Sequence, residues 1–199
     1  MLMGQDEAGK PGPRRNAVAT RARILEAARF HFARAGYDQV GMRQIAVTAR
    51  VDAALIVRYF GSKEALFREV MAKGFQLGDD FLSGGREGLG ERLVRYVAAK
   101  AGANRDMDPV LILLRSGSNE QAGSILRQGL DEGFVQPLAR WLGGNHAPER
   151  AGLIASTLFG LAFMREVVRI EPLAEADIDR LVALVAPALQ RYVDGSDPA

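Results

Sequence analysis

Two short helical patterns separated by a short turn constrain the fold of this chain more than any other feature of its sequence. The first covers residues 42–49, and the second covers residues 53–60, where Ile56 and Phe60 share one helical face. Helices of about two turns are not stable alone in water, so each must pack on other helices. A compact three-helix unit built around such a turn is the helix-turn-helix design.

An earlier segment supplies the first helix of this unit. Apolar residues recur there at helical spacing, with Thr20 as a suitable N-cap and Gly36 as a suitable stop, at Ile24, Ala28, Phe32 and Ala35. Gly41 and Asp52 can cap the next two helices, while Gly61 ends the third and Ser62 caps a fourth that runs to about Lys73. We expect this region, residues 18–78, to form one domain.

The rest of the chain predicts further helices and no strands. No segment alternates with the period of two that a half-buried strand requires. Breaks rich in Gly, Pro and Asn separate the remaining helical patterns, which lie near 91–101, 109–115, 120–142, 148–170 and 175–193. The sequence thus predicts an all-α protein of about nine helices, in which residues 79–199 form a second, larger bundle and residues 1–17 a flexible basic arm.

The composition excludes several classes of protein. The chain has 199 residues, of which 48% are apolar and 25% are charged, as in an ordinary folded domain. It has no cysteine, which removes disulfides and thiolate metal sites and fits a reducing cytoplasm. No uninterrupted apolar run approaches the roughly 18 residues of a membrane helix, so we expect no membrane partner.

Positive charge is concentrated in the first third of the chain. Residues 1–73 carry 13 Lys and Arg against seven Asp and Glu, a net charge of +6. The remainder carries 13 against 17, a net charge of −4. A local basic region is the electrostatic footprint of a polyanionic partner such as DNA.

The residues of the helix-turn-helix resemble the DNA-binding domain of the tetracycline-repressor (TetR) family of regulators. The resemblance covers about 55 residues and rests on segments in the family's order and spacing: Thr20–Ala28, Gly36-Tyr37, Met42–Ala46, Ala49–Asp52 and Ile56–Phe67. The C-terminal half matches the family only in length and helix content. The resemblance implies a homodimer that binds palindromic operator DNA and releases it when a small molecule binds.

This sequence departs from the family pattern at three places. Arg50 stands where the family usually has a turn glycine, so we expect a left-handed residue that carries a side chain there. Val57 replaces a frequent tyrosine that would reach a phosphate. Ala53, Ala54 and Leu55 begin the recognition helix almost without hydrogen-bonding groups, which limits base reading there to apolar contact with thymine methyl groups.

Other residues supply the polar contacts to DNA that the resemblance implies. Arg43, with Gln44 beside it, begins the second helix and can bind a guanine edge, although Arg43 could instead be a solvated surface residue. Arg58 should point outward, toward either a base or a phosphate. Phosphate contacts are expected from Thr20, Tyr59 and Lys63, although Tyr59 could instead pack in the core.

For the C-terminal half we expect a pocket for a mostly apolar effector, and a dimer interface. Candidate effector contacts are Arg115, Asn119, Trp141, Phe159 and Phe163. Candidate interface residues are Gly152, Ser156, Gly160 and Leu184, although the small residues could instead pack within one subunit.

Two other functions stay open at this point. One is a non-specific architectural DNA-binding protein, because the recognition helix is so apolar. The other is a helical enzyme, which the missing metal, cofactor and nucleophile motifs disfavour; neither His31 nor His146 lies in a catalytic pattern.

Overall fold

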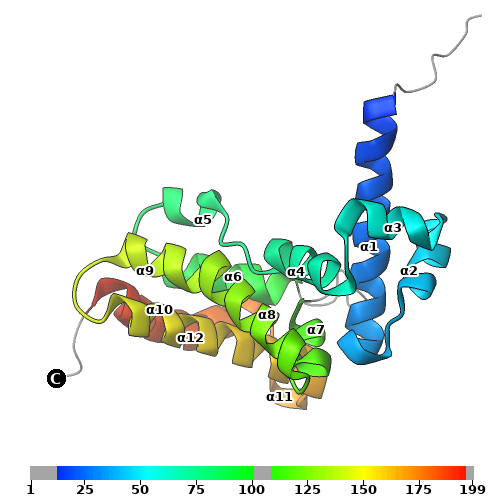
Figure 1. Ribbon diagram of the computed structural model, residues 1–199. Coiled ribbons are helices and arrows are strands. Elements are labelled where there is room, and N and C mark those ends of the chain that lie inside the picture. The colour runs from blue at the N-terminus through cyan, green and yellow to red at the C-terminus, as the bar shows by residue number, and fades with distance from the viewer. Residues whose placement is uncertain (1–12, 101–108, 196–199) are drawn as a thin grey trace, which may run out of the picture.

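The long helix α1 (Pro13–Gln39) is the axis of the N-terminal domain (Figure 1). The computed structural model describes residues 13–100 and 109–195. Helix α1 begins at Pro13, a residue suited to the first helical position. No residue between Pro13 and Thr20 breaks a helix, so the helix starts before Thr20. Thr20 is therefore an interior residue and not an N-cap, and residues 13–17 belong to the helix instead of the predicted arm. The other residues of that arm, 1–12, lie outside the described part.

Helices α2 (Met42–Ala49) and α3 (Ala53–Phe60) pack beside α1 as the helix-turn-helix pattern predicts. Ile45, Ala46 and Ile56 are buried against it. The Asp52 carboxylate caps α3 by accepting a hydrogen bond of 2.7 Å from the Ala54 N–H. Arg50 ends α2 with φ 53° and ψ 51°, which confirms the left-handed turn residue expected from the missing glycine.

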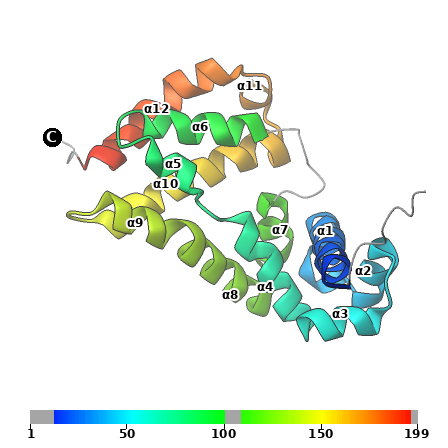
Figure 2. The ribbon, with the colours of Figure 1, turned by 90° about the horizontal axis from the view of Figure 1, so that it is seen from above.

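Helix α4 (Lys63–Gly74) leads from this domain to the C-terminal one, and the two domains share a hydrophobic core. The Ser62 hydroxyl caps α4 as predicted, accepting from the Ala65 N–H at 3.1 Å. Buried residues of α1–α4 pack with Ile112, on α7 (Pro109–Ser116), and with Ile125 and Leu126, on α8 (Glu120–Leu130). Helices α7 and α8 lie directly against α1 and α4 (Figure 2). The N-terminal domain is thus built onto the C-terminal domain and not joined to it by a free linker.

The remaining helices form a second bundle with a core of its own. Its order is α5 (Asp79–Ser83), α6 (Leu89–Lys100), η2 (Asp131–Val135), α9 (Gln136–Leu142), α10 (Ala147–Ala162), η3 (Phe163–Val168), α11 (Glu171–Ala174) and α12 (Ile178–Asp194). The predicted helix 120–142 is present, but the π-helical turn η2 divides it, and η3 follows α10 in the same way. Such turns and short helices raise the number of segments above the nine expected. The all-α architecture is confirmed, since the described residues contain no strand.

One segment of the bundle, Ala147–Val168, is long and apolar enough by length and composition to cross a membrane. No uninterrupted apolar run of the sequence is this long, because the segment contains Glu149, Arg150, Arg165 and Glu166. Core helices of helical bundles can be equally long and apolar, and this one packs against α6, α9 and α12.

Candidate nucleic-acid interface

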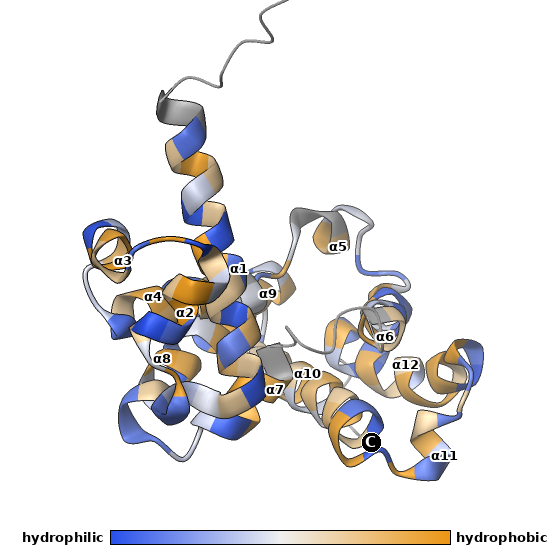
Figure 3. Ribbon diagram, turned by 90° about the vertical axis from the view of Figure 1, so that its right-hand side faces the viewer, coloured by the Kyte–Doolittle hydropathy of each residue, from blue (hydrophilic) through white to orange (hydrophobic). Residues whose placement is uncertain are grey.

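The outward face of α3 is apolar and ends in an arginine. Ala54 is exposed, Val57 retains 50% of its exposure, and Arg58 is exposed, as its position two residues after the buried Ile56 predicts. The helix is coloured as hydrophobic over most of its length (Figure 3). Ala53 and Leu55 are only half exposed. Apart from Arg58, this face presents methyl groups and not hydrogen-bond donors.

Polar groups at the start of α2 flank this apolar face. Arg43 and Gln44 are both exposed. The Gln44 side-chain oxygen accepts a hydrogen bond of 2.7 Å from the Gly41 N–H, so that part of Gln44 serves the helix cap. Farther along α2, Thr48 is tied to α1 through a 2.7 Å hydrogen bond between its hydroxyl and His31 Nε2. Burial and the Arg34 charge lower the pKa of His31, which favours the neutral ring in this contact.

Lys63 stands at the first turn of α4, over the ring of Tyr37. Its ammonium nitrogen lies 4.2 Å from the ring centroid, a cation–π arrangement. Burial lowers the pKa of Lys63, against the opposing effect of the Asp38 and Glu64 carboxylates. Burial and then Glu64 raise the pKa of Tyr37 to about 12. The lysine is therefore held in one place by an aromatic platform, at a helix N-terminus that itself attracts anions.

The other predicted phosphate contacts are partly used within the protein. Tyr59 is half-buried against the core, and its ring lies 6.3 Å from that of Phe60. The Thr20 hydroxyl accepts a hydrogen bond of 3.4 Å from Arg23. Sequence reasoning missed the role of Arg21, which pairs with Glu69 on α4 and lies 5.0 Å over the Phe60 ring. No local pattern could reveal this pair, because its members are 48 residues apart.

Two family models together span most of the chain. The model for bacterial regulatory proteins of the tetR family matches residues 24–70, and the model for the tetracyclin repressor-like C-terminal domain matches residues 87–193. The chain belongs to the TetR family. It is therefore a DNA-binding transcription regulator and not an enzyme. The resemblance carried by the helix-turn-helix residues is confirmed and extends over the C-terminal half, where the sequence offered no motif.

Several transcription regulators are similar to this chain. The TetR-family regulator SCO0857 from Streptomyces coelicolor A3 is 33% identical, with a TM-score of 0.59 over 92% of this chain and 99% of that one. The HTH-type transcriptional repressor SCO4008 of Streptomyces coelicolor is 44% identical over 59 residues, so the match spans 31% of that relative and 30% of this chain. FadR from Bacillus subtilis, solved in complex with stearoyl-CoA, shares the fold at 19% identity, with a TM-score of 0.61 over 88% of this chain and 99% of that one.

The structure does not bring the predicted effector contacts together. Arg115 donates hydrogen bonds to the Ala33 and Arg34 carbonyls of α1, and Asn119 donates to the Asp38 carboxylate at 2.7 Å. Trp141 lies at the opposite end of the bundle, where the Arg86 guanidinium stacks on it at 5.3 Å. Phe159 and Phe163 are half-buried, on α10 and η3.

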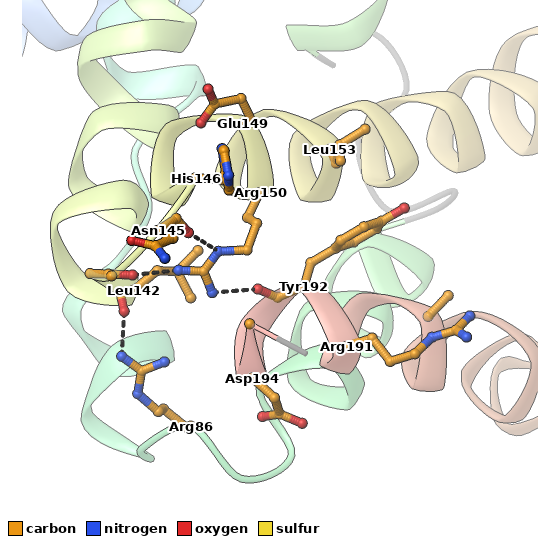
Figure 4. A pocket seen from close by; sticks show the side chains of 14 residues that line it. Arg86, Leu142, Asn145, His146, Glu149, Arg150, Leu153, Arg191, Tyr192 and Asp194 are labelled. Atoms are coloured by element: carbon orange, nitrogen blue, oxygen red, sulfur yellow. Dashed lines mark hydrogen bonds between the residues drawn. The ribbon is translucent and has the colours of Figure 1, made fainter. Parts of the chain in front are cut away.

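A groove of about 910 Å³ is lined by Arg86, Arg150 and Arg191, and the first two of these arginines serve the fold (Figure 4). Arg150 donates hydrogen bonds to the carbonyls of Gly143, Asn145 and Tyr192, and Arg86 donates to those of Leu142 and Val193. These carbonyls belong mainly to the C-terminal ends of α9 and α12, where backbone carbonyls have no N–H partner within the helix. The arginines thus cap two helices and oppose their negative dipole ends.

The small residues proposed for the dimer interface face open space in the single subunit. A Cβ atom added at Gly152 or Gly160 would meet no heavy atom within 4 Å. Ser156 is exposed between them, and Leu184 on α12 retains 69% of its exposure. Packing of these small residues within one subunit, the alternative left open above, is not what the structure shows.

Proposed function

We propose that this TetR-family regulator binds a palindromic operator as a homodimer and represses transcription in the cytoplasm. The observation that carries the proposal is the apolar outward face of α3, flanked by the exposed Arg43 and Arg58 and by the anchored Lys63. Arg43 would read a guanine edge, while Ala54 and Val57 would contact thymine methyl groups. Lys63, Tyr59 and Thr20 would fix the register on phosphates, with Gln44, Ala53 and Leu55 supporting this surface.

The exposed face of α10 and α12 supports the dimer. Leu184 retains 69% of its exposure and Leu153 retains 46%, beside the uncovered Gly152, Ser156 and Gly160. Small residues allow helices to approach closely, and exposed leucines supply the apolar area that an interface between identical subunits needs. Two N-terminal domains related by a twofold axis would then match two operator half-sites.

Selection of bound DNA from a random pool tests operator recognition. The wild-type protein should enrich a palindrome, whereas an architectural DNA-binding protein would enrich no consensus. Arg43→Ala should lose discrimination at one base pair of each half-site, about 1–3 kcal/mol for a bidentate contact. Arg68→Ala is the matched control, since Arg68 is an exposed arginine of α4 that lines a groove against α8. An Arg43→Ala consensus identical to that of the wild type would contradict the role of Arg43.

We further propose that a mostly apolar effector binds between α4 and the bundle. Phe159 contacts Phe75, just after α4, at 5.5 Å between ring centroids, and Phe134 at 6.4 Å. Phe134 belongs to η2 and Phe163 to η3, and π-helical turns are frequent at functional sites. Arg115, Asn119 and Trp141 have other partners in this structure, so Phe159 and Phe163 remain the contacts we propose. FadR of Bacillus subtilis, which holds stearoyl-CoA, is an example of a protein of this fold whose ligand carries a long apolar acyl chain.

A thermal-shift screen of apolar compounds, followed by operator titration with each hit, tests the effector proposal. Hits should raise the unfolding temperature and weaken operator binding by about 1–3 kcal/mol, because a ligand that favours one state disfavours the other by linkage. Phe163→Ala should reduce both effects together. Hits that stabilise the protein without changing operator affinity would show a pocket that does not control DNA binding.

A further inference from the structure

Polar contacts between the two domains gather at the C-terminal end of α1. The Ser116 hydroxyl accepts a hydrogen bond of 2.9 Å from the backbone N–H of Tyr37. Ser116 retains only 1% of its exposure, and no other polar or charged residue with described burial is classed as buried. A buried hydroxyl on α7 thus satisfies a buried N–H group just beyond Gly36, the predicted stop, where a φ of 74° and a ψ of 174° interrupt α1.

Two neighbouring side chains, Arg115 and Asn119, bind the segment around Tyr37 on both sides. Arg115 donates to the Ala33 and Arg34 carbonyls, the second at 2.8 Å, and Asn119 donates to the Asp38 carboxylate at 2.7 Å. The α7–α8 junction therefore contacts the chain on both sides of Tyr37, through backbone carbonyls of α1 before it and through the Asp38 side chain after it. A rigid-body shift of this junction must move Tyr37 or break these hydrogen bonds.

The ring of Tyr37 lies beneath Lys63, the proposed phosphate contact. Its ring centroid lies 4.2 Å from the Lys63 ammonium nitrogen. The ring also stacks on Phe32, with 6.1 Å between ring centroids, and makes an edge contact with Phe67 at 5.0 Å. With only 5% of its surface exposed, Tyr37 has little freedom to move independently of its backbone.

We infer that Ser116 is a positioning residue for the phosphate contact of Lys63, acting through the Tyr37 backbone N–H and the Tyr37 ring. This inference rests on the proposed function, in which Lys63 binds an operator phosphate. It also gives the C-terminal domain a direct route to the interface, since Ser116 ends α7 while Lys63 begins α4. The hydrogen bonds of Arg115 and Asn119 keep the same route rigid.

The experiment compares wild type, Ser116→Ala, Lys63→Ala and the double variant on operator DNA obtained by selection. Affinity is measured over a range of salt concentrations, because each lost phosphate contact lowers the slope of log affinity against log salt by about one unit. Lys63→Ala should lower this slope by about one unit per protomer. Ser116→Ala should weaken operator binding about fivefold, the effect of one hydrogen bond, and lower the same slope. In the Lys63→Ala background, Ser116→Ala should change neither quantity.

The slope of log affinity against log salt separates a positioning role of Ser116 from a loss of folding. A loss of folding would weaken operator binding whether or not Lys63 is present. Tyr37→Phe keeps the aromatic platform and should keep the wild-type slope, whereas Tyr37→Leu should lose it. If Ser116→Ala does not fold, Asn119→Ser replaces it in the experiment. The serine hydroxyl can still cap α8, but the donor to Asp38 is lost. Its weakening of operator binding should likewise vanish in the Lys63→Ala background. A Ser116→Ala effect of equal size with and without Lys63 would overturn the inference while leaving the proposed function intact. No DNA binding by the wild type would overturn both.

Discussion

Leu184→Glu is expected to convert the proposed homodimer into folded monomers. Leu184 retains 69% of its exposure in the single subunit, so glutamate there costs the isolated fold little. In a twofold interface the same substitution would bury two carboxylates close together, one from each subunit. An uncompensated buried charge costs about 3–5 kcal/mol, which corresponds to a loss of more than a hundredfold in dimer affinity.

Sedimentation equilibrium at micromolar concentration measures this effect. Wild type should sediment as a dimer and Leu184→Glu as a monomer with unchanged helical content, and the monomer should bind a single half-site weakly. Leu114→Glu, at a leucine of α7 that is 40% exposed and lies away from this face, is the matched control and should remain dimeric. A wild-type monomer, or a Leu184→Glu dimer of normal affinity, would rule out this interface.

Local signals in the sequence predicted the helix caps and the turn of the N-terminal domain well. Asp52 and Ser62 accept hydrogen bonds from the N–H groups that a cap should satisfy, and Arg50 has the left-handed backbone expected from the missing glycine. These features depend on residues within a few positions of one another, so a linear pattern contains the information. The helix-turn-helix residues also identified the family, because their spacing follows from a packing geometry that its members share.

Partners distant in the chain could not be predicted in the same way. Arg115 and Asn119 looked like polar groups for an effector, but their hydrogen bonds go to α1, about 80 residues earlier. Nothing within their own helices distinguishes a polar side chain that faces a pocket from one that faces another domain. Thr20 failed as a cap for a related reason, since a good capping residue does not prevent a helix from starting earlier.

Gly36→Ala is expected to destabilise the protein more than most single substitutions. Gly36 has φ 74° and ψ 174°, a region that only glycine occupies readily, so alanine costs about 1–3 kcal/mol in backbone strain. Its Cβ atom would also overlap the Arg115 carbonyl oxygen, which belongs to a packed backbone and cannot rotate away. Overpacking of this kind adds about 1–3 kcal/mol. Denaturant unfolding followed by circular dichroism measures the sum.

Gly61→Ala separates the two contributions. Gly61 also has a positive φ, 79°, but a Cβ atom there would meet nothing within 4 Å. Its cost should therefore be backbone strain alone, and the excess cost of Gly36→Ala should report the contact between α1 and α7. Equal costs at the two glycines would mean that α7 moves aside without penalty. The close approach of α1 to α7 would then contribute nothing to coupling between the N-terminal and C-terminal domains.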